Sequence, residues 1–452
     1  MYYTMQNLIS NKKGNEIGGV LMRRNYLNVN EKGHLEYFGC DTVKLAEEFK
    51  TPLYVMSEDG IRNHCKLLKK TFMNKYPNTL PLYASKAFSC IAMYKIIKDE
   101  GLGIDVVSGG ELYTAIKAGF PMENVYFHGN NKSIEEIEFG IKCKVGCFVI
   151  DSFHEIEVLQ KIAKQRGVTV KVILRISPGI SGHTHEYIAT GQLDSKFGFP
   201  IQGGVAFDAI EMVNNCENLK YYGIHCHIGS QMFTKEVYKE TVYIMTRFMV
   251  DLKSKLGLET EELNVGGGFG IYYANGDSPL PIEEFMEIII TSIYEKCKEF
   301  SLKIPKILIE PGRWIVGENG ITLYTVGAIK EIEGIRKYVS VDGGMADNPR
   351  PSLYQAEYEA IVASKANQEN KELVTIAGRC CESGDMLIRN ITLPEMEAGD
   401  ILAILSTGAY NYSMSSNYNR LPRPGVIMLK NGNARTVVKR ETYEDIVRND
   451  LE

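Results

Sequence analysis

Three groups that could do chemistry follow short apolar runs rich in β-branched and aromatic residues. Lys86 ends the run LPLYASK, residues 266–268 form a Gly-Gly-Gly run after ELNV, and Glu310 ends KILIE. A lysine in a closed site can pair with a phosphate or form a Schiff base with a carbonyl. Consecutive glycines let backbone N–H groups approach an anion closely, because no Cβ intrudes.

Together these groups indicate a site for pyridoxal 5'-phosphate (PLP). That cofactor needs a lysine for its aldehyde, an anion site for its phosphate and a partner for its pyridine nitrogen, which Glu310 could be. Arg313 could add a charged fork to the anion site. Each group alone has a simpler interpretation: Lys86 as a solvent-exposed lysine and the glycine run as a tight turn. The prediction therefore depends on their combination.

The elements that must position these groups alternate regularly between Pro81 and Gly312. Eight β-rich runs are separated by stretches whose apolar residues recur at helical spacing. Eight such units in roughly 230 residues predict a closed, parallel (β/α)8 TIM barrel. A doubly wound sheet is the alternative, but it normally has GxGxxG after its first strand, and LPLYASKAF has none. The runs end near Lys86, Asp105, His128, Asp151, Arg175, His227, Gly266 and Glu310.

The positions of these polar residues fit the functional end of such a barrel. The active site of a TIM barrel lies at the C-terminal mouth, and the loops after strands seven and eight often bind phosphate. Polar groups at so many strand ends would be costly in a buried core, so we expect a solvated site. The glycine run follows the seventh strand, and Glu310 ends the eighth.

The sequence changes in character after Gly312. Strand-like runs such as KYVSVDGG and LVTIAG are separated by Gly, Pro and Asp turns, which predicts a mainly antiparallel, sandwich-like or barrel-like β domain. The run HLEYFG near the N-terminus is expected to join it. We therefore expect a PLP-binding barrel over residues 57–312, a β domain formed by 25–56 with 313–452, and an N-terminal extension over 1–24.

The composition excludes several classes of protein. The chain has 452 residues, of which 44% are hydrophobic and 24% charged, as in an ordinary globular protein. A net charge of -5 argues against a nucleic-acid partner. No apolar run approaches the roughly 20 residues of a membrane helix, and no signal pattern begins the chain, so we expect a cytoplasmic protein. Ten cysteines without a CxxC pair predict neither a disulfide scaffold nor a metal site.

A set of motifs runs in a fixed order from about Leu35 to Pro424: YASKAF, DVVSGGEL, HTHEYIATGQLDSKFGF, HCHIGSQ, NVGGGFGI, EPGRWIVG, VDGGMADNPRPSLY, CCESGD and GDILAILSTGAYNYSMSSNYN. In these motifs the chain resembles the alanine-racemase-like, fold type III PLP enzymes, and within them the diaminopimelate decarboxylases. HEYIATG with DSKFG, and CESGD with GAY, are the most specific combinations. The resemblance implies PLP-dependent decarboxylation of meso-2,6-diaminoheptanedioate to L-lysine and CO2, the last step of lysine biosynthesis.

The resemblance also implies how the cofactor is bound. Lys86 would form the Schiff base, His227 would stack on the ring and Glu310 would pair with the pyridine nitrogen. The full set of expected cofactor-binding residues is Lys86, His227, Ser230, Gly266, Gly267, Gly268, Glu310, Gly312, Arg313 and Tyr410.

The substrate-binding residues follow from the same resemblance. Arg313, Arg350 and Tyr354 would bind the carboxylate at the non-reacting end of the substrate. Glu382 would bind the amino group there, and Tyr410 would touch both substrate and cofactor. Together with Lys86 and His227, Cys381 is expected to be catalytic, as the proton donor to Cα. Because Cys381 and Glu382 would enter the site from the partner subunit, the resemblance implies a homodimer with shared active sites.

Three other functions are compatible with the same fold. A decarboxylase of ornithine, lysine or arginine would leave the paired arginines without a substrate carboxylate. An amino-acid racemase of this type would have an arginine where Glu310 stands. A silent PLP-binding or regulatory protein should have lost Lys86 or Cys381, and both are present. For Cys381 itself, the alternative to proton donation is a buried, inert thiol.

Overall fold

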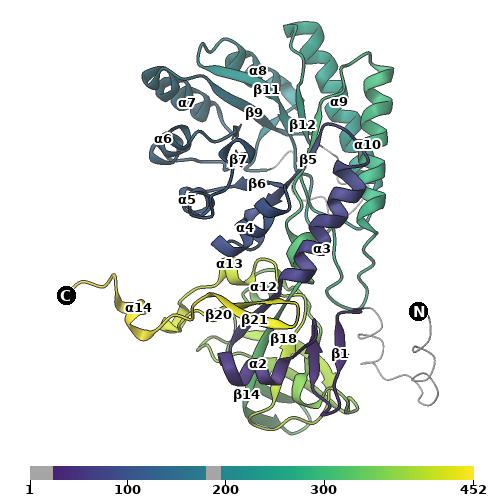
Figure 1. The fold of residues 1–452 in the computed structure, drawn as a ribbon, viewed down its shortest axis with the longest axis vertical. Coiled ribbons are helices and arrows are strands. Elements are labelled where there is room, and N and C mark those ends of the chain that lie inside the picture. Colours follow the sequence, from purple (N-terminus) through teal and green to yellow (C-terminus); the bar gives the residue numbers. More distant parts are fainter. Residues whose placement is uncertain (1–23, 180–194) are drawn as a thin grey trace. The chain divides into compact units, whose positions relative to one another are not determined.

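Eight parallel strands close into a barrel in the computed structural model, which describes residues 24–179 and 195–452 (Figure 1). The strands are β5 (Thr79–Ala84), β6 (Gly103–Val106), β7 (Val125–Phe127), β8 (Cys147–Ile150), β9 (Val170–Ser177), β11 (Leu219–His225), β12 (Glu262–Asn264) and β13 (Lys306–Ile309). β5 pairs with β13 and with β6, and the pairing of β8 with β9 closes the barrel. Most of their residues are buried, as expected of strands covered on both faces. The predicted barrel is confirmed.

Helices alternate with these strands: α4 (Ile91–Asp99), α5 (Gly109–Lys117), α6 (Ile134–Cys143), α7 (Phe153–Arg166), α8 (Val205–Asn214), α9 (Glu236–Leu256) and α10 (Ile282–Glu299). Serines begin three of them, since Ser108, Ser133 and Ser152 each accept a backbone N–H three residues further on. Ser133 also forms a capping box with Glu136. Ser108 and Ser152 lie two residues after β6 and β8, so these strand ends are joined to their helices by very short turns.

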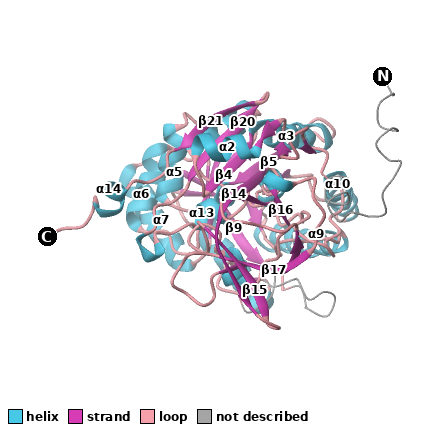
Figure 2. Ribbon diagram, turned by 90° about the horizontal axis from the view of Figure 1, so that it is seen from below, coloured by secondary structure: helices cyan, strands magenta, loops and turns pink. Residues whose placement is uncertain are grey.

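The barrel belongs to a compact unit of residues 60–317, and the described residues before and after it form a second unit. A nine-stranded sheet dominates that second unit, and Figure 2 shows several of its strands. Its strands are β4 (Leu53–Ser57), β14 (Gly320–Ile332), β15 (Arg336–Val341), β16 (Ala360–Val362), β17 (Glu372–Ala377), β18 (Met386–Leu393), β19 (Ile401–Ile404), β20 (Gly425–Lys430) and β21 (Asn433–Val438). Short helices include α12 (Arg350–Tyr354) and α13 (Asn411–Met414).

The strand β4 was not among the predicted strands, although it lies inside this sheet. It pairs antiparallel with β14 and parallel with β20 (Figure 2). All five of its residues are buried, so it lacks the alternation of apolar and polar residues that marks a half-exposed strand. A second parallel pair joins β15 and β17, while the remaining pairs of the sheet are antiparallel. The sheet is therefore mixed, but mainly antiparallel as predicted.

The N-terminal segment shares a core with this sheet. It forms a small sheet of β1 (Leu27–Val29), β2 (Leu35–Tyr37) and β3 (Cys40–Asp41), followed by helix α2 (Thr42–Phe49). Leu35 and Tyr37 pack in one apolar cluster with Val55, Leu323 and Ile427.

Two predicted features lie outside the described residues. The expected N-terminal extension lies there except for its last residue, and so does the motif HTHEYIATG. In the part of the chain that the structure describes, no helix combines the length and apolar character needed to cross a membrane.

Candidate active site

Lys86 lies in a single helical turn directly after β5, and its side chain is exposed. Two acids of the next β/α unit hold this turn. The backbone N–H of Ser85 donates to Asp105 Oδ1 at 3.2 Å, and the Ser85 hydroxyl donates to Glu111 Oε2 at 2.6 Å. No hydrogen bond to the Lys86 amine is found among the described residues, so this amine is available to a ligand.

His227 lies two residues after the end of β11 and contacts the glycine run. The N–H of Gly267 donates to Nδ1 of His227 at 3.3 Å. Burial, together with the positive charges of Lys86 and Arg175, lowers the pKa of His227 well below its usual value. The ring is therefore neutral at physiological pH, and its Nδ1 lone pair is fixed by the glycine run.

The glycine run brings neighbouring strand ends into close approach. A Cβ on Gly267 would lie 2.0 Å from the backbone oxygen of Glu310, and a Cβ on Gly268 would lie 2.2 Å from that of Gly229. The N–H groups of Gly266 and Gly267 donate to protein side chains. Within the described residues the N–H of Gly268 has no such partner. Of the three N–H groups expected to approach an anion, this one is free to do so.

Ser230 and Arg313 lie in direct contact. Nη2 of Arg313 donates to Oγ of Ser230 at 2.8 Å, and Nη1 donates to the Tyr273 hydroxyl at 2.5 Å. Before Arg313 stands Gly312, where a Cβ would lie 2.8 Å from that of Ala84. A guanidinium beside a hydroxyl is a suitable pair for an anion. Tyr273 was not predicted, because nothing in GFGIYY distinguishes it from a core aromatic residue.

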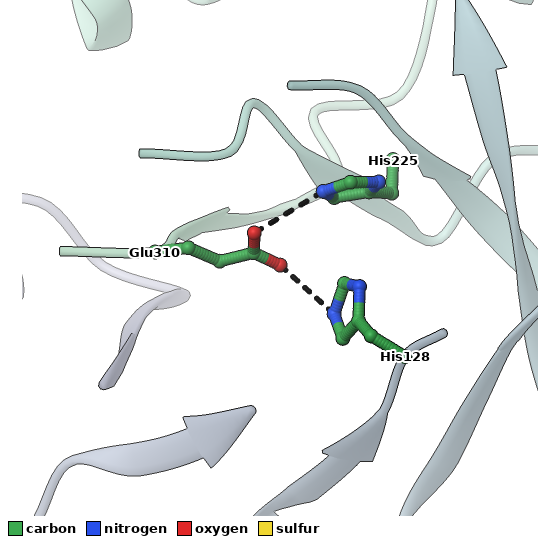
Figure 3. A group of neighbouring side chains, drawn as sticks. All are labelled: His128, His225 and Glu310. Carbon is green, nitrogen blue, oxygen red and sulfur yellow. Dashed lines mark hydrogen bonds and ion pairs between the residues drawn. The ribbon is translucent and has the colours of Figure 1, made fainter. Parts of the chain in front are cut away.

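Glu310 follows β13, and three nitrogen atoms lie close to its carboxylate. Figure 3 shows two of them, from His128 and His225. Nδ2 of Asn264 donates to Oε1 at 2.7 Å, Nε2 of His128 lies 3.0 Å from Oε1, and Nε2 of His225 lies 3.2 Å from Oε2. All four side chains are buried. His225 and Asn264 were not predicted. His225 ends β11 two residues before His227, and the first histidine of the motif HCHIGSQ was the signal that could have identified it.

The orientation of Asn264 explains how this cluster is held. Its Oδ1 accepts the backbone N–H of Gly266 at 2.9 Å, so its amide nitrogen must face Glu310. One potential ligand atom from each of His128, His225 and Glu310 lies within 4.8 Å of the other two, a grouping also seen around metal ions. Here the N–H groups of Asn264 and His225 donate to the two carboxylate oxygens, whereas Nε2 of His128 lies close to Oε1 without the geometry of a hydrogen bond.

The electrostatics of the cluster favour an ionised Glu310. Burial acts to raise the pKa of its carboxyl, but His225 and His128 outweigh burial and hold that pKa well below its usual value. Burial lowers the pKa of His225 to about 4 and also lowers that of His128. Burial and the charge of Glu310 raise the pKa of Asp105 well above its usual value. Of the two acids Asp105 and Glu310, Glu310 is therefore the one that is charged.

The predicted substrate-binding residues other than Arg313 lie in the second unit. Arg350 begins α12, is buried and donates from Nη1 to the Tyr358 hydroxyl at 2.5 Å. Nδ2 of Asn411 donates to the same hydroxyl at 3.4 Å, so Tyr358 connects α12 with the segment of Tyr410. Tyr354 ends α12 and is 64% exposed.

Cys381 and Glu382 lie in the loop between β17 and β18, and both are exposed. The N–H of Cys381 donates to Oδ1 of Asn419 at 2.8 Å, and the N–H of Cys380 donates to the buried carboxylate of Asp385 at 2.8 Å. All ten cysteines lie in the described part of the chain and are free, and Cys381 is the exposed one. It is therefore not the buried thiol of the alternative interpretation.

Comparison with known proteins shows the family of the chain. Residues 58–317 match the family model of the pyridoxal-dependent decarboxylase, pyridoxal binding domain. A diaminopimelate decarboxylase of Bacillus subtilis (strain 168) is 50% identical over 93% of this chain and 96% of its own. A crystal structure of diaminopimelate decarboxylase from M. jannaschii with L-lysine has a TM-score of 0.89 and 35% identity over 95% of this chain and 98% of that one. A lysine/ornithine decarboxylase from Vibrio vulnificus, 21% identical, shares the fold with a TM-score of 0.72, over 89% of this chain and 99% of that one.

Together with this family match, the barrel and its polar mouth identify a pyridoxal-dependent decarboxylase, and the chain belongs to that class of enzymes. Within the class it belongs to the diaminopimelate decarboxylase family, since the identity to the Bacillus subtilis relative extends over both units. The resemblance seen in the motifs is confirmed.

Proposed function

We propose that this protein uses PLP to convert meso-2,6-diaminoheptanedioate to L-lysine and CO2, as the last step of lysine biosynthesis. The observation that carries this proposal is Glu310, a buried carboxylate directly after the last barrel strand that accepts hydrogen bonds from Asn264 and His225. An acid of this kind suits a cofactor whose ring nitrogen must stay protonated. When bound, PLP supplies an electron-accepting ring for the electron pair left at Cα as CO2 departs.

The residues of the barrel mouth fit this cofactor. The N–H of Gly268, the hydroxyl of Ser230 and the guanidinium of Arg313 offer donors for a phosphate. The exposed amine of Lys86 would hold the cofactor aldehyde. The ring of His227, kept neutral and fixed at Nδ1, would face the cofactor ring.

The substrate has a second carboxylate at its non-reacting end, and we assign this group to Arg313, Arg350 and Tyr354. Guanidinium forks match carboxylates, so two arginines favour a substrate that is anionic at this end. Glu382 would bind the amino group beside that carboxylate, and Tyr410 would contact both substrate and cofactor.

Cys381 would deliver the proton that replaces the lost CO2 at Cα. Its exposure on a loop supports this role, because the sulfur is accessible. The family resemblance implies that Cys381 and Glu382 enter the active site of the partner subunit. We therefore propose a homodimer with shared active sites. Ten unpaired cysteines are consistent with a cytoplasmic enzyme, where thiols stay reduced.

The decisive experiment measures CO2 release from meso-2,6-diaminoheptanedioate with and without added PLP, alongside ornithine, lysine and arginine. We expect PLP-dependent release, with the dicarboxylic substrate preferred. Preference for a basic amino acid would contradict the proposed substrate. Racemised substrate without CO2 would contradict the reaction, and bound PLP without any turnover would indicate a silent cofactor-binding protein.

Shared active sites can be tested by mixing two inactive variants, Lys86→Ala and Cys381→Ala. In a mixed dimer with shared sites, one site combines Lys86 of the Cys381→Ala chain with Cys381 of the Lys86→Ala chain, so this site has both residues. The other site of the same dimer has neither. Random exchange of subunits would then restore about a quarter of the wild-type activity. If each site is built from one chain, mixing restores nothing.

A further inference from the structure

His128 and His225 have no role in the proposed reaction, yet both lie against the carboxylate of Glu310 (Figure 3). His128 directly follows β7, His225 ends β11 and Asn264 ends β12. Three strand ends therefore converge on an acid that follows a fourth strand. Oε1 of Glu310 faces Asn264 and His128, whereas Oε2 faces only His225 among the described residues, which leaves acceptor capacity on Oε2.

The hydrogen-bonding pattern indicates that His225 is neutral. An ionised carboxylate only accepts hydrogen bonds, so Nε2 of His225 must carry the proton that it shares with Glu310. Nδ1 of His225 is buried and has no partner among the described residues. A second proton at Nδ1 would be buried without an acceptor, which is unfavourable. The pKa of about 4 for His225 agrees with this assignment.

Neutral donors affect Glu310 differently from a charged partner. His225 and Asn264 stabilise the ionised carboxylate through hydrogen bonds, and His128 approaches Oε1 at 3.0 Å, but these neutral groups leave its negative charge uncompensated. A protonated histidine would instead cancel that charge. Arg175, a positive group near the cluster, lies 3.9 Å from a carboxylate oxygen of Asp151. Glu310 therefore keeps a charge that can hold a cationic group, such as a protonated ring nitrogen.

We propose that His128 and His225 are positioning residues that keep Glu310 ionised and correctly oriented for the ring nitrogen of PLP. This inference rests on the proposed function, because it requires the cofactor to bind in the barrel mouth. Both histidines act through Glu310, so they govern the protonation of the cofactor ring and leave substrate affinity nearly unchanged. Asn264 supports the same carboxylate from a position that Gly266 already fixes.

A matched pair of variants at each histidine separates this role from simple packing. Glutamine places an N–H near the position of Nε2, whereas leucine has a similar size and no donor. Each variant is reconstituted with PLP labelled with ¹⁵N in the ring, and the ¹⁵N chemical shift reports the protonation of the ring nitrogen. Values of kcat and KM for meso-2,6-diaminoheptanedioate are measured in parallel.

We expect His225→Gln and His128→Gln to keep the ¹⁵N shift of a protonated ring, as in the wild type. His225→Leu and His128→Leu should move it toward the unprotonated value and lower kcat about 10- to 100-fold, with KM nearly unchanged. If a leucine variant fails to fold, methionine at the same position gives the same comparison.

Equal ¹⁵N shifts in the leucine and glutamine variants, both with PLP bound, would overturn the inference and leave the proposed function intact. A wild-type protein that takes up no PLP would overturn both. The two failures are therefore distinguishable from the wild-type spectrum alone.

Discussion

The carboxylate of Asp385 accepts the backbone N–H of Cys380 at 2.8 Å and that of Met345 at 2.6 Å. Asp385 is only 2% exposed, and it ends the CESGD loop that begins with Cys381. A Cβ on Gly378 would lie 2.2 Å from this carboxylate, so glycine is required there for Asp385 to reach both N–H groups. The loop that carries Cys381, the residue expected to deliver a proton, is thus anchored by Asp385 through the N–H of the neighbouring Cys380.

The variant Asp385→Asn should weaken this loop. An amide has one acceptor oxygen, so its NH2 group would face one of the two backbone N–H groups. We expect a loss of about 1–3 kcal/mol in the free energy of unfolding, measured by urea denaturation, together with slower turnover. The exposed Asp251→Asn is the control and should change neither quantity. An Asp385→Asn enzyme of wild-type stability would show that the loop is held by other contacts.

Cys381→Ala should slow catalysis and leave cofactor binding nearly intact. Loss of a positioned general acid typically costs 10²- to 10⁴-fold, so we expect kcat to fall roughly 100-fold or more. Cofactor content is read from the absorbance of bound PLP. Cys143→Ala, at a half-buried thiol, is the matched control. Full-speed turnover by Cys381→Ala would mean that another group delivers the proton.

Lys86→Ala should abolish the yellow absorbance of bound PLP and the activity together. The amine of Lys86 is exposed at the barrel mouth, and its replacement removes the group that would hold the cofactor aldehyde. Lys95→Ala, an exposed lysine of α4, should keep both the colour and the activity. An unchanged spectrum in Lys86→Ala would contradict the assignment of this lysine.

Gly268→Ala should reduce both stability and PLP affinity. Gly268 has φ of +101°, and an added Cβ would lie 2.2 Å from a backbone oxygen. Gly276 has a similar φ of +109° with nothing within 4 Å of an added Cβ, so Gly276→Ala measures the backbone strain alone, about 1–2 kcal/mol. The free energy of unfolding and a PLP titration compare the two variants. Equal effects would mean that the close approach at Gly268 is unimportant.

Asp347 should make the free energy of unfolding depend on pH. Burial raises the pKa of Asp347 from 3.8 to about 7, so the folded protein keeps a proton that the unfolded chain releases above about pH 4. The contribution of this group is fully present below pH 4 and is lost as the pH rises to about 7, by roughly 4 kcal/mol at most. Unfolding of the wild type and of Asp347→Asn between about pH 5 and about pH 8 should show the wild type losing stability relative to the variant. A constant difference would refute the raised pKa.

The barrel was predictable because its signal is local. Each of its strands is a short apolar run that ends near a polar residue. A stretch whose apolar residues recur at helical spacing follows the strand. β4 carries no such signal, because the run LYVMS is compatible with any buried segment and does not indicate a strand. Its place between β14 and β20 is decided by residues more than 250 positions away. The parallel pair β4–β20 was missed for the same reason. The parallel pair β15–β17 was missed although both strands were predicted, because an apolar run does not show the direction of its neighbour in the sheet.

Parts of the candidate site were predictable through motifs, whereas their supporting residues were not. Glu310 ends a strand, but the amide of Asn264 that holds it depends on a bond to Gly266, which only the folded geometry shows. Tyr273 and Tyr358 each bind an arginine through their hydroxyls, yet they are two of 26 tyrosines with no distinguishing pattern. Side chains that orient a functional group leave a weaker trace in the sequence than the group itself.

The place of β4 has a consequence for synthesis on the ribosome. Its five buried residues emerge before the whole barrel, while its neighbours β14 and β20 emerge after it. Until then β4 is an apolar strand with both edges unpaired, the kind of segment that invites association between chains. The barrel can complete its own strand pairing during this interval, because all of its strands emerge before β14.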